Sequence, residues 1–522
     1  HTISGLGIPA EPLFRSRDYK KPLYYIYNIY YSISSVLNYR ESKIKKLRLI
    51  FMNKKQIFLS ICLFIVFFSL LSVASASDTT ENVTVTAVSD DSNAISVTDN
   101  QDYNLGASPG SFTYLNDTIA GSHAGDTITL TNTNYLSGDG DFSEGILIDK
   151  DITLDGQGST INAQGSASIF NIQGNSKVIL KNIKFTNAVG VNGSAIKLGS
   201  SAQLEIIKCT FNNNVAQMCG GAIYVADSSS LTSNLIINGS TFNGNSARFG
   251  GAIYWTGDHG SLIDSKFTSN TASQDGGAIY WEGHSGLIKD STFEYNKVSG
   301  VLNSTKQVIR HNDDTGIDEI HYDILGGDGG AIIWKGSDAI IEGSTFNKNY
   351  APYRGGAIFF TGMEGENCTN VTINNTNFNE NYAAMNGGAI DWAIGASNAT
   401  IISSHFIKNV ADRSAGAIYV RGDGLEIKDS EFKNNRLTGN TLYDNRTDGM
   451  TFTSIGGNGG AICWMGSYGT VDNVIFTDNI ASQRGGAIQF ERNVNGTVKN
   501  SRFTGNRAGT EGGAIDFYNG DL

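Results

Sequence analysis

The stretch FTSNTASQDGGAIYW, residues 267–281, joins a Phe-x-x-Asn motif to a Gly-Gly-Ala-Ile motif through a few small polar residues. Both motifs recur along the chain. Gly-Gly-Ala-Ile begins at Gly220, Gly250, Gly276, Gly329, Gly355, Gly387, Gly459, Gly485 and Gly512, with the variant Ala-Gly-Ala-Ile at Ala415. The preceding Phe-x-x-Asn begins at Phe211, Phe242, Phe267, Phe293, Phe346, Phe378, Phe406, Phe432, Phe476 and Phe503. The commonest step between copies is 26 residues, a period that indicates a stacked repeat architecture.

Within each unit the apolar residues alternate with others, which is typical of strands. An Ile follows every glycine pair, and two residues later the same strand face carries Val, Trp or Phe. All five tryptophans of the chain fall in this second column. A second apolar segment, such as SLIDSKF at 261–267, alternates again and places Ser two residues before Phe.

Units of this length with short strands cannot bury their apolar face alone, but stacked copies bury a continuous core. We therefore predict an all-β parallel β-helix with three strands per rung. Phe and Ile would fill the core, Trp or Phe would cap the strand, and Asn would turn the chain and bond its amide to that of the next rung. The glycine pair would permit the positive φ of a tight corner. With rungs about 4.8 Å apart, ten copies make a rod on the order of 50 Å long.

The composition supports an ordered repeat protein. The chain has 522 residues, 62 glycines, only 5 prolines and a formal charge of -12. This acidic balance argues against a nucleic-acid or anionic-membrane binder. Regular apolar residues argue against disorder.

The N-terminal region predicts export. From Met52, the positive MNKK, the apolar run Ile57–Leu71 and the ASA ending at Ala76 predict a signal peptide over 52–76. The run is short for a transmembrane anchor, the alternative. Residues 1–51 are interpreted as spurious upstream translation, with a real membrane-proximal extension as the alternative.

The remaining chain divides into a polar linker (77–104), a cap region (105–140) and the β-helix (141–522). Within the cap region SFTYLNDTIAG predicts a helix, because Phe112, Leu115 and Ile119 fall at helical spacing. The chain stops mid-rung at GGAIDFYNGDL, so we expect a truncated protein whose C-terminal anchor is missing.

The cysteines and the glycosylation sequons do not indicate what stabilises the fold. Cys209, Cys219, Cys368 and Cys463 are too few for a disulfide scaffold. Cys209 and Cys219 either bridge a corner or are a buried and a solvent-facing thiol. Eleven Asn-x-Ser/Thr sequons suit a glycosylated exported protein.

The paired motifs resemble the repeats of the chlamydial polymorphic outer-membrane proteins. Together with GDTITL and GILIDKDITLDGQGSTI, the layout is similar to adhesin-like surface proteins of methanogenic archaea, over roughly residues 105–522. The resemblance implies a right-handed parallel β-helix, secreted or at the cell surface, that serves attachment or surface structure without catalysis. Its expected partners are glycans or proteins of other cells or matrix. No cofactor, metal or nucleic acid is expected, and membrane contact only through the signal peptide or the missing anchor.

Two surfaces are candidates for binding. The outward column after the motif's Ala offers aromatic faces for sugar rings or a partner protein, unless it only stacks across rungs to stabilise the sheet. Its aromatic members are Tyr224, Tyr254, Tyr280, Phe359 and Tyr419. Two inserts, 297–328 and 436–458, leave the same corner four copies apart, roughly 20 Å along the axis. The first insert gathers possible cation ligands, or forms a solvated acidic loop: His311, Asp313, Asp314, His321 and Asp323.

The alternative function is a carbohydrate-active enzyme, a polysaccharide lyase or glycoside hydrolase, on the same fold. It needs two carboxylates at a defined separation, or a Ca²⁺ cluster with a basic residue, on one outward face. Asp391 and Asp516 lie four copies apart, whereas Glu491 and Asp516 lie on neighbouring rungs. His259 and His284 occupy nearly equivalent turns and could pair as metal ligands, although plain turn residues are the simpler interpretation.

Overall fold

The computed structural model describes residues 108–518 apart from 139, 227–234, 313–316, 364, 439–456 and 492–494, and of residues 301–325 it describes only the backbone. The predicted upstream segment 1–51, signal peptide 52–76 and linker 77–104 lie outside these residues and stay predictions. None of the described helices is long and apolar enough to cross a membrane.

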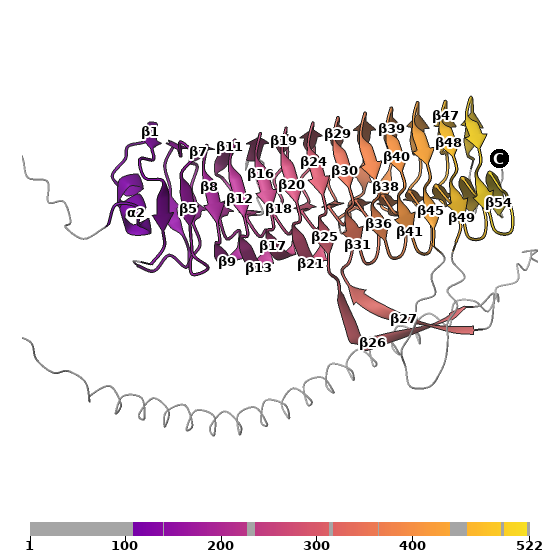
Figure 1. The fold of residues 1–522 in the computed structure, drawn as a ribbon, viewed down its shortest axis with the longest axis horizontal. Coiled ribbons are helices and arrows are strands. Elements are labelled where there is room, and N and C mark those ends of the chain that lie inside the picture. The colour runs from indigo at the N-terminus through magenta and orange to yellow at the C-terminus, as the bar shows by residue number, and fades with distance from the viewer. Residues whose placement is uncertain are drawn as a thin grey trace, which may run out of the picture. The chain divides into compact units, whose positions relative to one another are not determined.

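The described chain coils into a parallel β-helix (Figure 1). One rung shows the path: β18 (Ile253–Trp255) leads to β19 (Ser261–Ile263), β20 (Lys266–Thr268) and β21 (Thr271–Asp275). Each strand pairs in parallel with the equivalent strand of the next rung, so Phe242 lies beside Phe267 and Ile253 beside Ile279. The stacking of like residues confirms the predicted fold.

Four sheets result, which we name A to D. Sheet A runs from β2 (Asn134–Leu136) to β52 (Arg502–Thr504) and contains β20. Sheet B runs from β1 (Asp126–Thr129) to β51 (Thr497–Lys499) and contains β19. Sheet C consists of β3 (Ile146–Ile148), β6 (Phe170–Ile172), β10 (Ile196–Leu198), β14 (Ile223–Val225), β18, β22 (Ile279–Trp281), β28 (Ile332–Trp334), β32 (Ile358–Phe360), β37 (Ile390–Trp392), β42 (Ile418–Val420), β46 (Ile462–Trp464), β50 (Ile488–Glu491) and β54 (Ile515–Tyr518).

Sheet D corrects the prediction of three strands per rung. It consists of β9 (Val189–Asn192), β13 (Val215–Cys219), β17 (Ser246–Phe249), β21, β25 (Lys297–Val298), β31 (Tyr350–Ala351), β36 (Tyr382–Ala383), β41 (Val410–Ala411), β45 (Arg436–Leu437), β49 (Ile480–Ala481) and β53 (Arg507–Ala508). These strands lie between the Asn and the glycine pair. Many have only two residues, and their inward side chain is often Ala, as at Ala272 and Ala383. Segments this short and weakly apolar lack the alternation that predicts a strand.

The core contains the predicted columns. Trp255 and Trp281 stack with ring centroids 4.2 Å apart, and Trp334 continues the stack at 4.3 Å. These rings end their strands as predicted, but they lie inside the core with no exposed surface. The Phe column stacks in the same way, as between Phe242 and Phe267 at 4.5 Å.

The predicted asparagine ladder is confirmed. Each Asn donates its Nδ2 to the Oδ1 of the next Asn at 2.9–3.1 Å, along the series Asn214, Asn245, Asn270, Asn296, Asn349, Asn381, Asn409, Asn435, Asn479 and Asn506. The same Nδ2 donates to a Phe carbonyl of the preceding rung, as from Asn270 to the oxygen of Phe242 at 3.0 Å. The ladder fixes the corner between sheets A and D.

The predicted cap helix is α2 (Phe112–Ala120), which buries Phe112, Leu115 and Ile119. Ser111 caps its N-terminus and accepts a hydrogen bond from the Tyr114 amide at 3.1 Å. However, β1 and β2 already pair with β4 (Ile152–Asp155) and β5 (Thr160–Asn162). The sheets therefore begin before residue 141, the predicted start of the β-helix.

Each insert lies between a strand of sheet D and the next strand of sheet C, at the predicted corner. The first forms an antiparallel pair, β26 (Val301–Asn312) and β27 (Ile317–Leu325), between β25 and β28. The second, between β45 and β46, lies mostly outside the described residues.

Candidate binding surface at the corner between sheets C and D

Two columns of residues meet outside the core at the corner where sheet D passes into sheet C, and we call them the corner strip. The first column holds the outward middle residues of sheet C: Tyr224, Tyr254, Tyr280, Ile333, Phe359, Asp391, Tyr419, Cys463, Gln489 and Asp516. The second holds the residues immediately before the glycine pairs: Cys219, Phe249, Asp275, Asp328, Arg354, Asn386, Ser414, Asn458, Arg484 and Glu511.

The five predicted aromatic residues lie in one column but do not form one exposed stack. Tyr224, Tyr254 and Tyr280 stack at 5.6 and 4.7 Å, the cross-rung stabilisation that was the alternative interpretation. Ile333 and Asp391 interrupt the column on either side of Phe359.

The expectation of exposed aromatic faces is wrong for Tyr280 and Phe359, which are only 8% and 3% exposed. The tight turn at the glycine pair brings the end of sheet D against the outer face of sheet C. Phe249 packs edge-on against Tyr280, with centroids 5.6 Å apart. The Arg354 guanidinium lies over the Phe359 ring, 4.1 Å from its centroid. Outward-facing residues are therefore covered at this corner.

Buried ion pairs continue the strip. Arg354 donates through Nε and Nη2 to both carboxylate oxygens of Asp328, at 2.9 and 2.6 Å. Arg421, at the end of β42, donates through Nη2 to Asp391 Oδ1 at 2.8 Å, and the Asp391 side chain has no exposed surface. The Arg354 charge also acts on Asp391. These four charged groups therefore form one electrostatic network on four consecutive rungs.

Three carboxyl groups of the strip, those of Asp275, Asp328 and Asp391, have a pKa above the ordinary value. Burial, together with the Asp328 carboxylate, raises the pKa of Asp275 to about 6, against the lowering effects of two backbone amides and Lys335. Those amides, of Gly327 and Asp328, donate to Asp275 Oδ1 at 3.0 and 3.1 Å. Burial raises the pKa of Asp391 to about 6 despite Arg421, and it also raises the pKa of Asp328.

Stability is expected to fall as pH rises from 4 to 6. With its pKa at about 6, folded Asp275 keeps its proton in this window while the unfolded chain loses it near pH 4. The folded state then binds more protons, so the free energy of unfolding declines with pH, by about 2–3 kcal/mol from Asp275. Asp275→Asn keeps the acceptor for both amides and should flatten the decline. Urea unfolding at pH 4, 5, 6 and 7 measures this, and an unchanged slope in the variant would contradict it.

Polar contacts also tie the tyrosines of the strip together. Tyr254 Oη donates to Glu282 Oε2 at 3.2 Å. Lys335 donates to Tyr280 Oη and, at 3.3 Å, to Glu282 Oε1. Burial, followed by Glu282, raises the pKa of both tyrosines. These phenols therefore stay protonated and serve as hydrogen-bonding groups.

Asp275, Asp328, Arg354 and Arg421 were not predicted from the sequence. A signal existed, because the residue before the glycine pair changes from Asp to Arg within two copies, in GDGGAI and YRGGAI. That alternation of opposite charges at one repeat position indicates an ion pair between neighbouring rungs.

The other predicted candidates do not form a site. His284 Nδ1 accepts from the Ser337 amide at 3.0 Å, and its Nε2 lies 3.6 Å from Glu366 Oε2. His259 contacts it through the backbone. Among the described residues, no group of three potential ligands could hold a metal ion.

Three further predictions concern the carboxylate pair, the cysteine bridge and the first insert. Gln489, not Glu491, lies beside Asp516, so Glu491 is displaced two positions along the strand. Cys209 and Cys219 are free, which makes the bridge wrong, and burial raises the Cys209 pKa to about 12. The insert candidates lie outside the described side chains: His311, Asp313, Asp314, His321 and Asp323.

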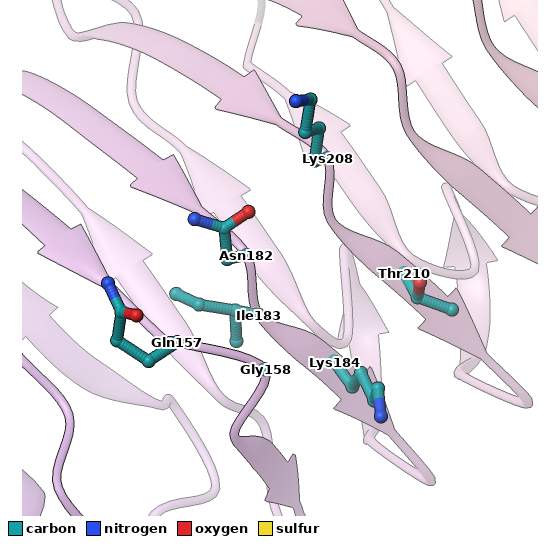
Figure 2. A pocket seen from close by; sticks show the side chains of 7 residues that line it. All are labelled: Gln157, Gly158, Asn182, Ile183, Lys184, Lys208 and Thr210. Carbon is teal, nitrogen blue, oxygen red and sulfur yellow. The ribbon is translucent and has the colours of Figure 1, made fainter.

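A separate hollow of ≈370 Å³ lies at the turn between β4 and β5 and beside the following rungs. Figure 2 shows its lining residues, among them Gln157, Asn182, Lys184 and Lys208. The hollow is open and lies at the N-terminal end of the rod, far in sequence from both inserts. Two surface lysines do not make a ligand site.

Comparisons with known proteins agree with the fold. A family model described as right handed beta helix region matches residues 251–420 and 392–521, which together exceed half of the chain. A model of the Chlamydia polymorphic membrane protein repeat matches 208–226 and 239–254. A search of curated proteins found no significant match. Among solved structures, the chain is similar to a PL6 family alginate lyase, AlyGC, with 9% identity over 78% of this chain and 99% of the other, at a TM-score of 0.14. So low a TM-score supports no argument about function.

Proposed function

The chain belongs to the right-handed β-helix family, and from that premise we propose that it is a non-catalytic attachment rod displayed outside the cell, binding glycans or proteins of other cells or matrix through its corner strip. The match to the Chlamydia polymorphic membrane protein repeat supports a surface-type protein. The predicted signal peptide supports export.

The corner strip suits recognition because planar rings and cations lie close together along it. Arg421, just outside the strip, lies 5.4 Å from the ring centroid of Tyr419 in the strip. Arg484 of the strip lies 4.3 Å from the ring centroid of Tyr518, two residues after Asp516. Half-buried Tyr254 has a hydroxyl at its edge. Aromatic residues and arginines of this kind are enriched where proteins bind partners.

The burial of Asp391 carries the non-catalytic part of the proposal. Its carboxyl pKa of about 6 would suit a general acid or base near neutral pH, and this favours the alternative of a polysaccharide lyase or glycoside hydrolase. However, the side chain has no exposed surface and is held by Arg421. A general base must come within hydrogen-bonding reach of its substrate. The Asp391 carboxylate is fully buried and therefore does not reach a substrate at the surface.

Attachment to cells and cleavage of polysaccharides can be measured on the same sample. Beads coated with the full chain should adhere to whole cells, while neither unsaturated products nor new reducing ends appear from a panel of acidic and neutral polysaccharides. Product formation that Asp391→Asn abolishes would establish the enzyme instead. Absence of both attachment and turnover in a folded sample would reject the corner strip as a functional surface.

A further inference from the structure

The Asn-x-Ser/Thr sequons differ in whether the fold leaves their hydroxyl accessible. Eight of the eleven lie among residues whose side chains are described. In two of the eight, at Asn116 and Asn367, the Thr hydroxyl hydrogen-bonds to a neighbouring residue. In three more, the hydroxyl donates to a backbone carbonyl and its residue is at most 1% exposed. These three residues are Ser194, Ser240 and Thr376, which complete the sequons at Asn192, Asn238 and Asn374.

The remaining three sequons share one place in the repeat, the turn from sheet C into sheet B. Asn370, Asn398 and Asn495 each lie two residues before a sheet B strand. These strands are β34 (Thr372–Asn374), β39 (Thr400–Ile402) and β51. All three asparagines are exposed, and the Thr that begins each strand is exposed or half-buried. This turn therefore presents complete sequons to solvent.

The turn favours the Asn of these sequons but does not require the Thr. Asn370 and Asn398 have φ of 57° and 52°, a left-handed conformation that Asn adopts more readily than most residues. On other rungs the same position is also left-handed without Asn, at His259, Ser285 and Asp338. Two residues later, the rungs on either side of the first two sequons have Leu287, Ile340 and Glu426 in place of Thr.

We propose that Asn370, Asn398 and Asn495 carry N-linked oligosaccharides, which cover the edge of the rod where sheet C passes into sheet B. Sequons of this kind are acceptors on the surface of exported proteins, so the inference requires export. The corner strip lies at the other end of the sheet C strands. The oligosaccharides therefore leave the strip uncovered, and the inference goes beyond the proposed attachment function.

The modification is a transfer from an oligosaccharide that is bound through phosphate to a carrier lipid. Asn Nδ2 attacks the anomeric carbon of the first sugar and loses one proton. The new C–N bond replaces the C–O bond to the phosphate, which leaves with the electron pair. Asn370 Nδ2 donates to Asp338 Oδ1 at 3.0 Å on the exposed surface. Because the modified nitrogen keeps one N–H, this hydrogen bond can persist after transfer.

Substitutions at Thr400 test the proposal by mass spectrometry of glycopeptides from the full chain, purified from the cells that export it. Thr400→Val keeps the shape of the side chain but removes the hydroxyl, so Asn398 should lose its oligosaccharide while Asn370 keeps its own. Thr400→Ser is the control and should retain both. Unmodified asparagines at all three positions of the unaltered chain, or a modified Asn398 in Thr400→Val, would overturn the inference.

The buried sequons at Asn192, Asn238 and Asn374 test whether the fold selects the sites. The folded full chain and its chymotryptic peptides are each incubated with an oligosaccharyltransferase and a lipid-linked oligosaccharide. The peptides should be modified at both groups of sequons, and the folded chain only at the turn between sheets C and B. Equal modification of both groups in the folded chain would contradict this selection. Cell attachment that fails while the three sites are occupied rejects the proposed function alone.

Discussion

Gly356→Ala is expected to destabilise the rod by at least about 3 kcal/mol, because overpacked backbone has no room to relax. Gly356 is the second glycine of its pair. A Cβ there would lie 2.0 Å from the carbonyl oxygen of Gly388 on the next rung and 2.7 Å from the backbone of Tyr382. Both obstacles are backbone atoms fixed by parallel pairing. Urea unfolding followed by circular dichroism measures the loss.

Gly395→Ala is the control for this substitution. Its Cβ would come no closer than 3.3 Å to another atom, the Gly362 amide nitrogen, so it should cost less than about 1 kcal/mol. If Gly356→Ala were as stable as the control, neighbouring rungs could not be as close at the glycine pair as the structure places them.

Asn381→Ala is expected to cost about 3–5 kcal/mol, because it breaks a buried hydrogen-bond network on both sides of one rung. Asn381 Nδ2 donates to Asn409 Oδ1 and to the Phe346 carbonyl, both at 3.0 Å. Its Oδ1 accepts from the backbone amide and the Nδ2 of Asn349, at 3.0 and 2.9 Å. Alanine leaves these groups buried and unpaired.

Asn347→Ala serves as the comparison, since half-buried Asn347 makes a single side-chain bond, to Glu294 Oε1 at 2.9 Å. It should change the unfolding free energy by less than about 1 kcal/mol. Equal effects of the two substitutions would mean that the ladder adds no stability beyond an ordinary surface bond.

The core of the fold could be predicted because several inward positions repeat one residue type from rung to rung. Phe stacks on Phe, Ile on Ile and Asn on Asn, so period and alternation together define the stack. The cap helix was predictable from the helical spacing of Phe112, Leu115 and Ile119. Sheet D was missed because its short strands bury small residues such as Ala383, which give no apolar alternation.

The site was predictable only in part. The aromatic column was found from its position after the motif's Ala, but its burial depends on how the glycine pair folds sheet D against sheet C. The polarity and the period of the sequence do not show how the glycine pair folds sheet D against sheet C. For Arg354 and Asp328 the sequence shows opposite charges at one repeat position, but only the rung register makes them neighbours.

Attachment by the corner strip is the central claim, and a pair of tyrosine variants tests it most directly. Tyr254 is half-buried on the strip, whereas Tyr468 is 68% exposed on the turn at the other end of the sheet C strands. Beads coated with the full chain carrying Tyr254→Ala should lose about tenfold or more of their attachment to whole cells, as expected for an aromatic contact. Beads with Tyr468→Ala should attach like the unaltered chain. Equal attachment by both variants, with both folded, would contradict the claim.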